Sequence, residues 1–172
     1  FIRTVDNFPI DGIAFRDITS LIETPEAFVK TCDELTKITR NFGADIVASI
    51  ESRGFIFAGT IARDLNLPFV LARKPGKLPN ETYKKSFDLE YGSTSIEIQK
   101  NTEIKNNQKI VIVDDLVATG GTAIACSEIF TENFNVKSEN ILILSIIDLP
   151  ELGGSKLISE KGYLIETLID YW

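Results

Sequence analysis

The sequence has 172 residues, 44% of them hydrophobic, and a formal net charge of −7. This length suits one domain with a sizeable core. The negative net charge argues against a nucleic-acid binder. No apolar run approaches the roughly 20 residues of a membrane span. It contains no histidine, which excludes the usual general base, histidine metal ligands and a Ser-His triad. We therefore expect a single domain over 1–172 that binds neither nucleic acid nor membrane.

The first clear element is a helix that begins at Pro25 and ends before Gly43. Thr24 is a suitable N-cap, and Pro at the first helical position followed by an acidic residue is typical of a helix start. Apolar side chains then recur at helical spacing, at Phe28, Cys32, Leu35, Ile38 and Phe42. Gly43 is a suitable end because glycine readily takes the left-handed conformation that closes helices.

Cys32 in this helix and Cys126 in a later helical stretch are the two cysteines of the chain. We expect reduced core thiols rather than a disulfide, as is typical of a cytoplasmic protein. The chain begins with Phe and contains no Met, so we also expect its natural start to lie upstream.

Strand-like runs without polar alternation follow, and helical stretches over 54–65 and about 121–130 separate some of them. The strand-like runs lie at 45–50, 68–72, 109–113 and 141–147, and a last strand is expected at 163–169 in the mixed C-terminal segment. Such runs are typical of a parallel sheet covered by helices on both faces, so the pattern predicts a doubly wound α/β fold with a mostly parallel sheet. The segment from Pro150, with a turn at Gly153-Gly154, is expected to pack as a small appendage.

The segment 74–100 breaks this alternation. It begins as a polar stretch rich in turn-forming residues and continues with strand-like pieces at 83–89 and 93–99. We expect a long loop leading into an antiparallel hairpin that projects from the sheet, and long loops in compact domains are usually functional or disordered. Positive charge gathers within thirteen residues here, at Arg73, Lys74, Lys77, Lys84 and Lys85.

The stretch 111–123, V-I-V-D-D-L-V-A-T-G-G-T-A, joins a strand to a small-residue loop and then to a helix. Ligands of open α/β sheets bind at the carboxyl ends of strands. Backbone N–H groups of such a loop converge on an anion, and the helix N-terminus adds partial positive charge. The predicted monophosphate cradle comprises Ala118, Thr119, Gly120, Gly121 and Thr122. It matches neither a Walker A loop nor the dinucleotide glycine pattern.

Asp114 and Asp115 would repel a bare phosphate in that cradle. They suit a ligand that carries hydroxyl groups beside its phosphate, such as a ribose phosphate, bound directly or through a hydrated divalent metal. The alternative is purely structural: two aspartates solubilise a strand end and two glycines form a turn.

These residues resemble the phosphoribosyl-pyrophosphate signature of the type I phosphoribosyltransferases, and A-T-G-G-T resembles the variant of the branch that acts on adenine. Four further segments are similar to that branch in order and spacing: F-P-I-D-G-I-A-F-R-D-I-T at 8–19, E-S-R-G-F-I-F at 51–57, R-K-P-G-K-L-P at 73–79 and L-E-Y-G at 89–92. The resemblance implies the type I phosphoribosyltransferase fold, with a small hood from about 1–20 and the C-terminal segment, and a mobile loop over about 74–92. It also implies a homodimer.

The implied reaction transfers ribose 5-phosphate from phosphoribosyl pyrophosphate to adenine and gives AMP and pyrophosphate. By resemblance, 118–122 would hold the 5′-phosphate, and Asp114 with Asp115 the ribose hydroxyls. Arg53 would bind pyrophosphate, in a loop with a non-proline cis peptide near Glu51-Ser52. Further positive charge for pyrophosphate and its associated magnesium would come from Arg73, Lys74 and Lys77. Mg²⁺ would be the cofactor, bound mainly through pyrophosphate and water.

The resemblance also assigns the base site. Ile13, Ala14 and Phe15 would line adenine, with backbone groups reading its edge. Glu90 would manage the purine proton, a role suited to a carboxylate in a chain without histidine. Tyr91 would pack on the closed loop or touch the reacting centre.

Simpler interpretations stay open for individual residues. Phe15 suits ordinary core packing, Arg53 a solvated helix start, and Glu90 an exposed hairpin tip. Arg16 and Asp17 would form a local ion pair, and Lys84 and Lys85 would be exposed loop charges. For the whole chain, the alternatives are a 6-oxopurine or xanthine phosphoribosyltransferase, and a non-catalytic regulator that senses phosphoribosyl pyrophosphate.

Overall fold

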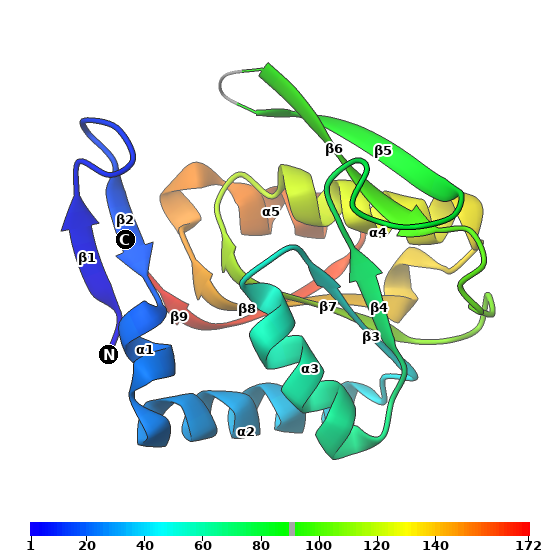
Figure 1. Cartoon of the computed structure of the whole chain (residues 1–172), viewed down its shortest axis with the longest axis horizontal. Helices are drawn as coiled ribbons and strands as arrows, with labels where there is room; N and C mark the ends of the chain where they lie inside the picture. The colour runs from blue at the N-terminus through cyan, green and yellow to red at the C-terminus, as the bar shows by residue number, and fades with distance from the viewer. Residues whose placement is uncertain (90–91) are drawn as a thin grey trace.

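The computed structural model describes residues 1–89 and 92–172 (Figure 1). Its centre is a parallel sheet with strand order β4-β3-β7-β8-β9. The strands are β3 (Ile46–Ile50), β4 (Phe69–Ala72), β7 (Ile110–Val117), β8 (Ile141–Asp148) and β9 (Leu164–Asp170). This arrangement confirms the predicted doubly wound α/β fold.

Helices cover both faces of the sheet, with α2 and α3 on one side and α4 and α5 on the other (Figure 1). Their bounds are α2 (Pro25–Phe42), α3 (Gly54–Leu65), α4 (Gly121–Asn133) and α5 (Gly154–Glu160). Alternate residues of β7 enter different cores: Ile110 and Ile112 pack in the α4 cluster, whereas Val111 and Val113 pack in the α2 and α3 cluster. Both faces of the strand are therefore apolar, as its sequence required.

The boundaries of α2 agree with the prediction, but the role of Thr24 does not. Thr24 occupies the N-cap position without a side-chain capping bond, because its hydroxyl donates instead to the Ser20 carbonyl at 2.8 Å. Gly43 ends the helix with φ +74°, the left-handed conformation expected of glycine there. Cys32 and Cys126 are buried, and neither forms a disulfide within the described ranges.

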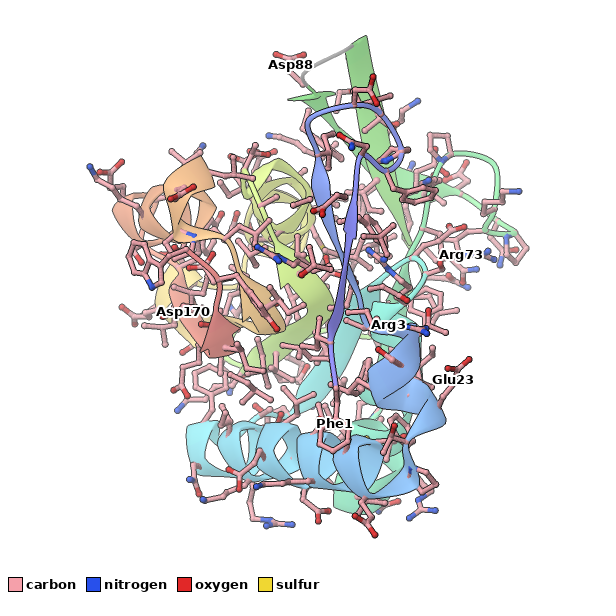
Figure 2. The ribbon with its side chains drawn as sticks, turned by 90° about the vertical axis from the view of Figure 1, so that its left-hand side faces the viewer. Phe1, Arg3, Glu23, Arg73, Asp88 and Asp170 are labelled. Atoms are coloured by element: carbon pink, nitrogen blue, oxygen red, sulfur yellow. The ribbon has the colours of Figure 1, made fainter. Side chains whose placement is uncertain are left out.

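Residues near the N-terminus form a hairpin of β1 (Arg3–Asp6) and β2 (Ala14–Asp17), followed by the short helix α1 (Thr19–Glu23). Figure 2 shows Arg3 on this hairpin close to Glu23, and Arg3 pairs with Asp17 at 3.1 Å. The predicted Arg16–Asp17 pair is therefore replaced, and the Arg16 guanidinium lies 4.5 Å from the centre of the Tyr171 ring. We refer to β1, β2 and their connection as the hood.

A second hairpin, of β5 (Thr82–Leu89) and β6 (Gly92–Gln99), lies over α4 at the top of Figure 1. Lys85 Nζ on β5 lies 3.1 Å from Glu128 Oε2 and 2.6 Å from Glu132 Oε1, both on α4. Lys85 is therefore a structural anchor, not the exposed loop charge that we considered. Backbone bonds between Arg73 and Glu97 join the hairpin to the end of β4.

Two further boundaries differ from the sequence prediction. β7 continues through Asp114, which pairs with Ser145 of β8, and ends at Val117. The segment after Pro150 is not an appendage, because it forms α5 and then β9, the edge strand of the main sheet. The helices of the described ranges include no candidate for a membrane span.

Candidate active site

The carboxyl ends of β3 and β7 lie side by side because these strands are parallel neighbours. A cavity of about 420 Å³ opens at this edge, under the second hairpin. Its lining comprises residues 50–53, Lys74, Phe87, 94–96, 114–116 and Thr122. Among the predicted site residues, it therefore brings together Arg53, Lys74, Asp114, Asp115 and Thr122.

The small-residue loop after β7 forms a second, smaller pocket of about 100 Å³, lined by Asp114 and residues 116–123. The two cavities adjoin, since Asp114, Leu116 and Thr122 line both. Gly120 has φ +80° and immediately precedes α4, so the loop leads directly into a helix N-terminus. The predicted cradle thus lies beside the acidic pair and leads into the positive end of a helix, an arrangement that suits an anion.

The acidic pair is tightly packed. Asp115 is buried and Asp114 is partly buried, and the Asp115 N–H donates to Asp114 Oδ1 at 2.9 Å. Burial, and after it the neighbouring Asp115 carboxylate, raise the pKa of Asp114 well above its usual range. Asp114 therefore keeps its proton to a higher pH than an ordinary aspartate does.

Arg53 faces this pair from the start of α3. Its Nε lies 2.9 Å from Asp115 Oδ2, yet Asp115 Oδ2 has no partner with hydrogen-bond geometry among the described residues. The Arg53 guanidinium also lies 5.3 Å from the centre of the Phe15 ring. Arg53 is therefore an ion-pair partner of the acidic site, not merely a solvated arginine at a helix start.

Glu51 organises the loop after β4, a role that the sequence analysis missed. The Glu51-Ser52 peptide is cis, as the resemblance implied. The Glu51 carboxylate accepts hydrogen bonds from Arg73 Nε at 3.2 Å and from the Lys74 N–H at 3.0 Å. Arg73 also donates to the Lys77 carbonyl at 3.2 Å. The Arg73 guanidinium is therefore occupied within the protein, whereas Lys74 lines the large cavity.

We expect Glu51→Gln to lower the thermal stability in a pH-dependent way. The Lys74 N–H, and after it Arg73, hold the pKa of Glu51 below its usual value. Because the folded pKa is the lower one, ionised Glu51 stabilises the fold fully above the unfolded value of about 4.3 and progressively less as pH falls through the folded pKa. The difference in Tm between wild type and variant should be constant from about pH 6 to 8 and shrink below about pH 4.

Differential scanning fluorimetry across this range measures the effect. Glu151→Gln, at an exposed residue of the short turn after β8, is the matched control. A Tm difference for Glu51→Gln that stays the same down to pH 3 would contradict the argument.

None of the described residues that were predicted to bind the base lines either cavity. Phe15 packs edge-on against Phe8, with ring centres 5.1 Å apart. Its ring also lies next to the Arg53 guanidinium, and Arg53 lines the large cavity. Ile13 and Ala14 are exposed on the hood and line neither cavity. Lys77 is likewise exposed and outside both linings. Glu90 and Tyr91 lie outside the described residues.

The sequence analysis also missed the hairpin wall of the large cavity. Phe87, Thr94, Ser95 and Ile96 line it. The alternation in I-E-I-Q at 96–99 indicated a strand, but nothing in the sequence showed that residues 94–96 would meet the acidic pair.

Comparison with known proteins gives a consistent result. The family model for the phosphoribosyl transferase domain matches residues 19–163. Adenine phosphoribosyltransferase of Agathobacter rectalis is 43% identical over 171 residues, which cover 99% of this chain and 95% of the relative. The crystal structure of adenine phosphoribosyltransferase from Thermoanaerobacter pseudethanolicus superposes with a TM-score of 0.89 at 38% identity, over 99% of this chain and 95% of that one. The Giardia lamblia enzyme in complex with 9-deazaadenine gives 0.89 at 35% identity, over 100% and 94% of the two chains.

Proposed function

This chain belongs to the type I phosphoribosyltransferase family, as an enzyme of adenine salvage that forms AMP, and we propose that the two adjoining cavities at the carboxyl edge of its sheet are where that reaction occurs. One observation supports this proposal above all others. An anion cradle and a carboxylate pair share lining residues at one strand end. That combination suits a ligand with a phosphate and neighbouring hydroxyls, as in phosphoribosyl pyrophosphate and AMP.

Residues 118–122 hold the 5′-phosphate in this proposal. Their backbone N–H groups, the hydroxyls of Thr119 and Thr122, and the N-terminus of α4 supply the donors and the partial positive charge. Asp114 and Asp115 accept hydrogen bonds from the ribose hydroxyls. The buried Asp115 Oδ2, which lacks a partner with hydrogen-bond geometry in the described chain, supports this role because a ribose hydroxyl would satisfy it.

Pyrophosphate is bound by Arg53 and Lys74. Both line the large cavity, and an arginine fork suits phosphate oxygens. Arg73 and Lys77 add positive charge at longer range, since Glu51 engages the Arg73 side chain and Lys77 is exposed.

Adenine binds under the hood, against Ile13, Ala14 and Phe15. Backbone donors and acceptors there distinguish a 6-amino from a 6-oxo purine, because donor and acceptor are exchanged between the two bases. By resemblance, Glu90 would manage the purine proton, and Tyr91 would pack on the closed loop or touch the reacting centre. The segment 74–92 would close over the substrates. Closure excludes water, which would otherwise hydrolyse the donor.

Mg²⁺ is the cofactor in this proposal, and the donor set fits it. Asp114 and Asp115, which carry hard carboxylate oxygens, line the cavity. Among the described residues, no group of three or more acidic, histidine or cysteine side chains is arranged to hold a metal alone. Magnesium is commonly held by one or two carboxylates together with substrate phosphates and water. Bound there, it would neutralise charge on the pyrophosphate.

The reaction is a displacement at the anomeric carbon of ribose. Purine N9 attacks, the bond to pyrophosphate breaks, and the transition state carries positive charge on the sugar. Asp114 and Asp115 stabilise that charge, whereas Arg53 and Lys74 stabilise the leaving group. Catalysis is then mostly positioning and electrostatics.

The experiment that tests this function is pyrophosphate release with adenine, hypoxanthine, guanine or xanthine, each with phosphoribosyl pyrophosphate and Mg²⁺. We expect turnover with adenine and at least about 10³-fold lower kcat/KM with the 6-oxopurines, because a site built to hydrogen-bond one edge rejects the reversed pattern. Preferred turnover of a 6-oxopurine, or tight donor binding without turnover, would overturn the assignment.

We further propose a cytoplasmic homodimer in which residues 1–172 form one domain. Two buried, unpaired cysteines support a reducing compartment, and the family resemblance supports the dimer. Sedimentation velocity tests the assembly against the 19.1 kDa of one chain.

A further inference from the structure

We propose that Gly154, at the start of α5, is a positioning residue for the phosphate cradle, although it lies more than thirty residues after it in the sequence. This inference rests on the proposed function of residues 118–122. It assigns to α5 the task of fixing the backbone of the cradle from behind.

The first observation is a hydrogen bond between the two segments. The Gly154 N–H donates to the Ala118 carbonyl at 3.0 Å. An anion site requires its N–H groups to face the ligand, and its carbonyls, which carry partial negative charge, to face elsewhere. Gly154 provides that alternative partner for Ala118 and so orients the first peptide of the cradle.

The second observation is the close approach of the two backbones. A Cβ at Gly154 would lie 2.2 Å from the Ala118 carbonyl oxygen, 2.7 Å from the Gly120 nitrogen and 2.8 Å from the Thr119 carbonyl carbon. All three are backbone atoms of the cradle, so no side-chain rotation relieves the contact. A Cβ on Gly120 would in turn lie 3.0 Å from the Gly154 oxygen. Any larger residue at Gly154 must therefore displace the loop.

Local conformation does not explain the glycine. Gly153 has φ +73°, a conformation that favours glycine, whereas Gly154 is outside the left-handed region. The first position of a helix also has no preference for glycine. Contact with the cradle is the feature of this buried residue that requires a hydrogen in place of a side chain.

Gly154→Ala tests the inference through the affinities for AMP and adenosine, measured by isothermal titration calorimetry. These ligands differ only in the 5′-phosphate. We expect AMP to bind at least about tenfold more weakly to the variant, because several phosphate hydrogen bonds lose their geometry, while adenosine binds as it does to wild type. Gly153→Ala is the matched control, since it strains the backbone but has no atom within 4 Å of its added Cβ. It should leave the AMP-to-adenosine ratio unchanged.

An unchanged ratio of the two affinities in folded Gly154→Ala would overturn the inference, whether both ligands bind as they do to wild type or both lose affinity equally. The wild-type protein provides a second measurement if the variant does not fold. The amide resonance of Gly154 should shift on titration with ribose 5-phosphate and not with adenosine, with Gly162 as the reference; no shift would again overturn the inference. The backbone amides of residues 119–122 separate the two proposals, because their failure to shift with ribose 5-phosphate in the wild-type protein would instead refute the cradle.

Discussion

Replacing Asp115 with Asn should lower kcat for AMP formation on the order of a hundredfold or more, while the protein stays folded. Asp115 is buried at the strand end beside Arg53, and its carboxylate belongs to the proposed ribose site. Asparagine keeps the shape but removes the charge that would stabilise positive character on the sugar. The loss should therefore fall mainly on kcat, because the stabilised charge develops in the transition state.

The fold should survive because the same substitution relieves a repulsion. Burial and the Asp115 carboxylate raise the pKa of Asp114. A folded pKa above the unfolded value means that the folded protein binds more protons between the two, so stability falls as pH rises through that interval. Asp115→Asn lowers the pKa of Asp114 towards its usual value and reduces this loss.

Asp148→Asn is the matched control for steady-state kinetics and thermal denaturation. Asp148 is also buried, at the carboxyl end of the neighbouring strand, but does not line either cavity. Wild-type turnover in folded Asp115→Asn would remove Asp115 from the mechanism. Equal losses in both variants would point to a general effect of buried aspartates.

Burial and long-range pairing explain which strands, and which strand ends, could be predicted from the sequence. The central parallel strands β3, β7 and β8 were predictable because each is buried on both faces, which produces an apolar run that no exposed segment needs. The end of β7 was not predictable, since two adjacent aspartates indicate the end of a strand. Asp114 nevertheless remains in the sheet because it pairs with Ser145 of β8, a partner thirty-one residues away.

Local signals failed in the same way at α5. Gly153-Gly154 indicated a turn, and the left-handed Gly153 confirms that part of the interpretation. The second glycine has a different cause, the contact with residues 118–120. Such a contact joins segments distant in sequence, so propensity alone cannot reveal it.

In the site itself, residue types were predictable and their pairing was not. The residues themselves pointed to Asp114 and Asp115, the resemblance added Arg53, and all three line one cavity. Glu51 shows the limit, since a carboxylate beside a predicted pyrophosphate loop has no evident use until Arg73 and the Lys74 N–H are seen to bind it.

Replacing Arg53 with Ala should lower kcat/KM for phosphoribosyl pyrophosphate by about 10²–10³-fold, with a much smaller change in KM for adenine. Arg53 is the arginine that lines the large cavity in the described chain, and its fork would contact the leaving pyrophosphate as negative charge develops there. The variant also removes the ion-pair partner of buried Asp115, so its Tm should fall too.

Arg53→Lys separates these two effects. It keeps a positive charge near Asp115, so stability should largely return, but a lysine lacks the fork and the planar surface that faces Phe15. Activity should therefore stay well below wild type. Arg63→Ala, at an exposed arginine on the same helix, should change neither property. If Arg53→Lys restores activity in proportion to Tm, Arg53 acts through the fold alone; if stability returns without activity, the guanidinium itself meets the pyrophosphate.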